Sequence, residues 1–121
     1  MKNKYALSLI EKIQKELLLD KFNCDTTIEY LKKLREYSFD DQNPVLTKAL
    51  RLAYEHLESN GAFLIGIPMD EPMDDSEKEF NFSETNDLES FEYFISLLLD
   101  LEKKNNILDL REYNKAFLAF T

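Results

Sequence analysis

The most apolar stretch with helical periodicity covers residues 86–104. When successive residues are rotated by about 100° on a helical wheel, its apolar side chains share one broad arc and its charged side chains lie opposite. This arc is roughly twice as wide as the apolar stripe of an ordinary surface helix. The pattern predicts one long central helix that contacts neighbours on two sides and around which the other helices pack. Its inward residues are Leu88, Phe91, Phe94, Ile95, Leu98, Leu99 and Leu101.

Both ends of this predicted helix carry suitable polar residues. Asn86 is expected to act as the N-cap, with Glu89 at the third helical position completing a box-like arrangement. Lys103 and Lys104 would lie at the C-terminal end, where the helix macrodipole favours positive charge.

Two earlier segments, 5–21 and 26–37, show the same 3.6-residue periodicity. The second opens with Thr26 and has Glu29 three residues later, which is the pattern of a capping box. Both segments are therefore predicted to be amphipathic helices. The inward residues of the first are Tyr5, Ala6, Leu9, Ile10, Ile13 and Leu17, and those of the second are Ile28, Leu31 and Leu34.

A third helix is predicted over residues 44–60. Asn43 is a favourable cap, and Pro44 suits the first helical position because its missing amide would be unpaired there anyway. Gly61 predicts a left-handed end to this helix.

The segment 62–67 is apolar but too short and too well punctuated for another helix, so it is predicted to be extended and buried. Residues 78–82 alternate between polar and apolar, and the two segments could pair as a β-hairpin. The alternative is two irregular segments that are held against the helices by Phe63, Ile65, Phe80 and Phe82.

The last helix is predicted to begin near Asp109, after a short connection at Asn105 and Asn106, and to run to the end of the sequence. Only two glycines and three prolines occur among 121 residues, which argues against a β-sandwich or barrel. The sequence therefore predicts a mainly α fold. We expect a single helical domain over 1–121, a compact bundle of about five helices with a short extended or β-hairpin insertion around 62–82.

Charge is concentrated in one window of the chain. Residues 70–92 contain ten acids and only Lys78 as a base, whereas the other fourteen acids and fourteen bases of the sequence cancel. The whole net charge of −9 therefore belongs to this window. The acids are Asp70, Glu71, Asp74, Asp75, Glu77, Glu79, Glu84, Asp87, Glu89 and Glu92.

Apolar side chains alternate with these acids, and apolar anchors within a charged rim are typical of protein-binding sites. We expect the segment to bind a basic protein surface. The predicted partner-binding residues are Asp70, Glu71, Met73, Asp74, Asp75, Glu77, Phe80 and Phe82. The alternative is that the acids are merely solvated. Nucleic acid is disfavoured as a partner, because phosphate binding needs clustered Lys and Arg.

Candidates for chemistry are few. His56 is predicted to border the apolar face of its helix, and Cys24 precedes a helix whose N-terminus could lower the pKa of the thiol. The acids from Asp70 onward do not fit a calcium loop, because Asp75 stands where glycine is needed. No catalytic residue, metal ligand or cofactor is therefore predicted.

A single cysteine excludes an intramolecular disulfide, and neither a signal peptide nor a membrane span is evident, so a cytoplasmic location is expected. The leading hypothesis is a non-catalytic binding module in the manner of an inhibitor, immunity protein or chaperone. One alternative is a small ligand-binding or enzymatic domain with a pocket between helices, served by Tyr30, Tyr37, Tyr54 or His56. Another is a structural homodimer subunit that associates through Leu7, Leu18 or the aromatic last helix.

Overall fold

Five α-helices and one short 3₁₀ helix form the part of the chain that the computed structural model describes, residues 1–68 and 86–120. The predicted mainly α class is confirmed. The elements are α1 (Lys4–Leu18), α2 (Cys24–Ser38), η1 (Phe39–Asp41), α3 (Pro44–Asn60), α4 (Leu88–Leu97) and α5 (Lys104–Ala119).

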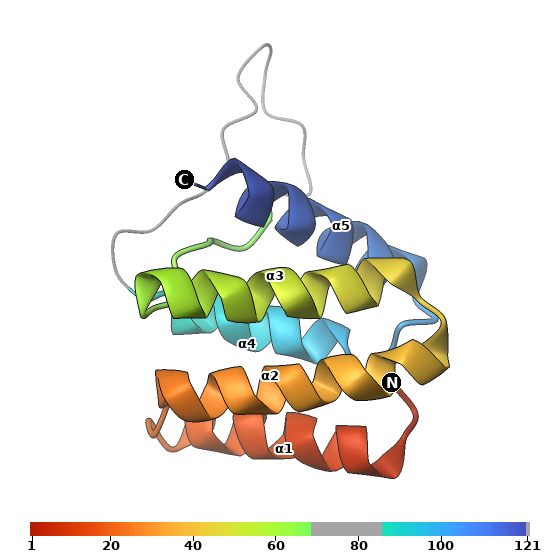
Figure 1. The fold of residues 1–121 in the computed structure, drawn as a ribbon, viewed down its shortest axis with the longest axis horizontal. Helices are drawn as coiled ribbons and strands as arrows, with labels where there is room; N and C mark the ends of the chain where they lie inside the picture. Colours follow the sequence, from red (N-terminus) through yellow and green to blue (C-terminus); the bar gives the residue numbers. More distant parts are fainter. Residues whose placement is uncertain (69–85, 121) are drawn as a thin grey trace.

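The five helices contact one another in a closed ring (Figure 1). The main contacts join α1 to α2, α2 to α3, α3 to α5, α5 to α4, and α4 back to α1. The prediction that the helix after residue 86 contacts neighbours on two sides is therefore confirmed. It is one member of this ring, however, and its main contacts are with α1 and α5, so the other helices do not all pack around it.

Aromatic rings form much of the buried core. Phe63, which follows α3, is fully buried, and its ring centroid lies 5.0 Å from that of Phe91 and 5.8 Å from that of Phe117. The buried Tyr113 hydroxyl donates to the backbone carbonyl of Ser90 at 2.9 Å, so its polar end is satisfied. The core therefore joins the segment after α3 to both C-terminal helices.

Asparagine side chains cap the first three helices. The Oδ1 atoms of Asn3, Asn23 and Asn43 accept backbone N–H groups from the first turns of α1, α2 and α3. The predicted start of α3 is confirmed, as is its end at Gly61, where φ is 71°. The capping box at Thr26 is wrong, because Asn23 already caps α2 and Thr26 donates its N–H to that cap.

The single long helix predicted for 86–104 is also wrong, since α4 covers only Leu88–Leu97. Its cap is Asp87 rather than Asn86. Beyond α4 the N–H of Glu102 donates to the side chain of Asp100 and not to Leu98, four residues earlier. Such aspartate side chains compete with helical backbone bonds. The chain turns at this point, and Leu99, predicted to face inward, is 45% exposed.

The last helix begins earlier than predicted. Helix α5 starts at Lys104, so the two asparagines expected to form a connection belong to its first turn. The side chain of Asn106 donates to the carbonyl of Asp100 at 2.8 Å, which ties the start of α5 to the preceding turn. Lys103 and Lys104 therefore stand at an N-terminus, not at the C-terminal end of α4.

The predicted β-hairpin is not supported. Its first arm, 62–67, contains no strand in the described part of the chain, and its second arm, 78–82, lies outside the described residues. Phe63 and Ile65 are buried, as expected for a segment that is held against the helices by its side chains.

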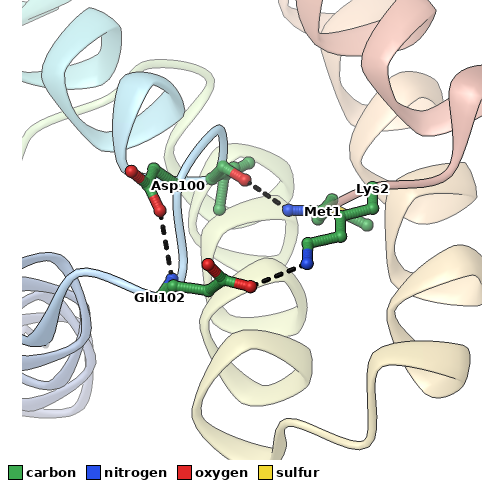
Figure 2. Close-up of polar contacts among 5 residues, drawn as sticks. Met1, Lys2, Asp100 and Glu102 are labelled. Carbon is green, nitrogen blue, oxygen red and sulfur yellow. Dashed lines mark hydrogen bonds and ion pairs between the residues drawn. The ribbon is translucent and has the colours of Figure 1, made fainter.

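The end of α4 receives an unexpected cation, the α-ammonium group of Met1 (Figure 2). This group donates to the carbonyl oxygen of Leu98 at 2.7 Å, and the Met1 residue is only 4% exposed. Burial lowers the pKa of the amine, and the nearby Asp41 and Asp100 oppose this shift. Lys2 forms an exposed ion pair with Glu102 in the same turn. A positive charge thus lies where the α4 macrodipole favours one.

We predict that a Gly-Ser extension before Met1 lowers the free energy of unfolding by about 1–3 kcal/mol, because it removes a buried, charge-assisted hydrogen bond. Urea unfolding measures the loss. The control carries the same dipeptide after Thr121, and equal stabilities of the two extended proteins would contradict the prediction.

Candidate functional site

All eight predicted partner-binding residues, from Asp70 to Phe82, lie outside the described residues. Three of the ten acids in the window are described. Asp87 caps α4 by accepting the N–H of Ser90 at 3.0 Å, while Glu89 and Glu92 are exposed on that helix. Asp87 is thus explained by helix capping, whereas Glu89 and Glu92 present their charge to solvent.

The two chain segments that flank residues 69–85 are hydrogen-bonded to each other. The N–H of Phe63 donates to Oδ1 of Asn86 at 2.9 Å, and the N–H of Asp87 donates to the carbonyl of Phe63 at 2.6 Å. Because Phe63 is itself fully buried, the start of α4 is fixed to the core at this point. Asn86 therefore holds the segment that contains Phe63 instead of capping α4.

His56 accepts a hydrogen bond from Leu64, the residue that follows Phe63. Its Nε2 accepts the N–H of Leu64 at 3.0 Å, so in the neutral ring the proton belongs on Nδ1. Burial lowers the pKa of His56 to about 4, which keeps the ring neutral at pH 7. The residue is 6% exposed and its ring contacts those of Phe63, Phe117 and Phe120.

The prediction of a boundary position for His56 is therefore wrong. A sequence signal for burial was present, because His56 follows Ala49, Leu52 and Ala53 at spacings of seven, four and three residues. Those spacings place it on the inward face of α3. With its Nε2 lone pair bonded to Leu64, the imidazole acts as a structural acceptor and not as a free base.

A surface pocket of about 280 Å³ lies beside His56, between the last turns of α3 and the end of α5. Helix α3 contributes Leu52, Glu55, His56, Ser59 and Asn60 to its lining. The other wall consists of Phe117 and Phe120. The pocket therefore combines an apolar wall with a rim that carries one carboxylate, a hydroxyl and an amide.

The three tyrosines considered for a ligand pocket do not line this one, and each makes contacts elsewhere. The Tyr30 hydroxyl donates to Glu16 at 2.9 Å, the Tyr37 ring stacks on Tyr5, and the Lys32 ammonium lies 5.5 Å from the centroid of the Tyr54 ring. Of the four side chains proposed for that alternative, the pocket thus includes His56 alone.

Cys24 is not activated by its position at the start of α2. Burial raises the pKa of its thiol, and the charge of Asp25 acts in the same direction. The Sγ atom lies 3.7 Å from the carbonyl oxygen of Leu57, to which the thiol can donate. A protonated thiol in this environment is a poor nucleophile.

Within residues 1–68 and 86–120, no three histidine, cysteine or acidic side chains gather in a way that could hold a metal ion. None of the helices in the same residues is long and apolar enough to cross a membrane. No protein-family model matches the chain, and the searches of curated proteins and of solved structures gave no match either. The charge distribution of the chain and the geometry around His56 are therefore the features that bear on function.

Proposed function

We propose that this protein is a non-catalytic module that binds a basic surface of another cytoplasmic protein through the acidic segment 70–92. The observation that carries the proposal is the concentration of the net charge of −9 in this window, while the rest of the chain is balanced. A charge gathered in one segment attracts an oppositely charged surface more strongly than the same charge spread over the whole molecule. Inhibitors, immunity proteins and some chaperones act by such binding.

The described end of the segment supports this proposal. Glu89 and Glu92 are exposed on α4, where a partner can reach them. Asn86 and Asp87 are bonded to Phe63 in the core, so this end of the segment needs no ordering when a partner binds. Binding is tighter where less conformational freedom is lost.

Neutralising four acids tests the proposal. Asp70, Glu71, Asp74 and Asp75 are replaced by Asn or Gln, and the wild-type protein is used to capture the partner from the native cell. We expect association of the captured partner with the variant to be roughly ten-fold slower at low salt, because electrostatic steering of the encounter is weakened. Added salt should slow wild-type association, since charges are screened beyond about 8 Å at physiological ionic strength.

The matched control removes four charges from the helical part of the chain, by substituting the exposed Glu11, Glu29, Glu36 and Asp40 with their amides. Both variants should keep the wild-type melting temperature, because the four control positions lie outside the buried core and the four acids of the segment are of a residue type that is almost never fully buried unless paired. Equal association rates for the two variants would contradict the assignment of the acidic segment as the binding surface.

A further inference from the structure

The pocket beside His56 lies where two helices end together. Figure 1 shows α3 and α5 side by side and running in the same direction, so that their C-termini meet at one end of the molecule. Each helix C-terminus carries roughly half a negative elementary charge from the aligned peptide dipoles. Neither α3 nor α5 has a basic residue in its last turn to offset this charge.

The side chains of the pocket strengthen this negative potential. Glu55 contributes a carboxylate, which is about half exposed and lies 3.6 Å from the Arg51 guanidinium in a surface ion pair. His56 adds no opposing charge at pH 7, because its ring is neutral. Arg51 partly offsets the charge of Glu55, so the preference of the pocket for a cation over an anion comes from the two helix ends together with the remaining charge of this carboxylate.

The apolar lining of the pocket suits the hydrocarbon part of a cationic side chain. Leu52 and Phe117 present hydrocarbon surface, against which the methylene stem of lysine or arginine can pack while its charged end remains at the polar rim. A cavity of about 280 Å³ admits one such side chain.

We propose that this pocket binds a lysine or arginine side chain of the protein partner, with the charged end beside Glu55. The inference rests on the proposed function and adds a second contact point for the same basic partner. It places this contact at the joint C-terminal end of α3 and α5.

The test uses small probes and does not require the partner. The full-length protein is titrated with n-butylguanidinium, n-butylammonium and n-butanol at pH 7 and constant ionic strength, and backbone amide chemical shifts are followed. Both cations should saturate with shifts centred on Ser59, Asn60 and Phe117. The neutral alcohol, which has the same hydrocarbon stem, should bind at least about ten-fold more weakly, because it lacks the charge attracted by the carboxylate and the helix ends.

A matched pair of substitutions on α3 separates the pocket from the general surface charge. Glu55→Gln removes the pocket carboxylate, whereas Glu58→Gln removes the same charge one turn away, where Glu58 pairs with Lys32. We expect Glu55→Gln to raise the Kd of n-butylguanidinium about three- to five-fold, and Glu58→Gln to leave it nearly unchanged. Equal effects of the two substitutions, or equal binding of butanol and the cations, would overturn the proposal.

The two proposals can fail independently. If the cations do not bind in the pocket, slow association of the four-fold neutralised variant would still support the acidic segment as the binding surface. If that variant associates at the wild-type rate while the cations still bind beside Glu55, the acidic segment is excluded and the pocket stands.

Discussion

Replacing Phe63 with alanine is expected to lower the free energy of unfolding by about 3–5 kcal/mol, the usual range for a buried phenylalanine. The side chain is fully buried and packs against rings from α3, α4 and α5. Its removal leaves a cavity at the point where these helices meet, and the surrounding rings can fill it only in part. Urea denaturation followed by circular dichroism measures the change.

The control for this substitution is Leu118→Ala. Leu118 is 59% exposed on α5, so its truncation should change the unfolding free energy by less than about 1 kcal/mol. The backbone bonds of Phe63 to Asn86 and Asp87 do not depend on its side chain, and circular dichroism should still show a helical protein. A loss below 1 kcal/mol for Phe63→Ala would contradict the central position of this ring.

The sequence alone predicts a helix boundary correctly where that boundary depends on a few neighbouring residues. Helix α3 begins at the Asn43 cap with Pro44 at its first position, and it ends at Gly61 in the left-handed region, as predicted. The buried faces of α1 and α2 likewise follow from the spacing of residues such as Ile10, Ile13 and Leu31, although Tyr5, predicted to face inward, is 59% exposed. These features could be predicted because each depends on interactions within about one or two helical turns.

Boundaries that depend on distant residues could not be predicted in this way. The helical-wheel pattern continues past Leu97, but the chain turns where Asp100 accepts a backbone N–H and where the Met1 ammonium binds the Leu98 carbonyl. The second of these bonds joins residues 97 positions apart. No periodicity within the segment contains that information, so the sequence pattern extends the predicted helix through the turn that follows α4.

The same distinction applies to the candidate site. The position of His56 on the inward face of α3 follows from its spacing to Ala49 and Ala53, yet its hydrogen bond to Leu64 depends on how the chain returns after Gly61. The pocket requires, in addition, that α5 lies parallel to α3, which the sequence of neither helix specifies. The concentration of acidic residues, by contrast, is a property of the sequence alone.

The buried His56 should also make stability depend on pH. Its pKa in the folded protein is about 4, below the ordinary value of 6.5 that applies to the unfolded chain. Between these two values the unfolded chain binds more protons, so stability is complete above pH 6.5 and falls as the pH decreases toward 4. We expect this group to remove roughly 2–3 kcal/mol of unfolding free energy between pH 7 and pH 4.5.

His56→Gln isolates this contribution from that of the carboxylates. Glutamine does not titrate, and its side-chain carbonyl can still accept the N–H of Leu64, whereas a protonated imidazole cannot, because its Nε2 would then carry a proton. The acids are the same in both proteins, so the difference between their stability-versus-pH curves reports His56 alone. Urea unfolding at pH 7, 6, 5 and 4.5 should show the wild type losing more stability than the variant as the pH falls, with most of the difference arising below pH 6.5. Parallel curves would mean that the imidazole has the same pKa in the folded and the unfolded protein. The assignment of His56 as a neutral acceptor that fixes the segment after α3 would then be wrong.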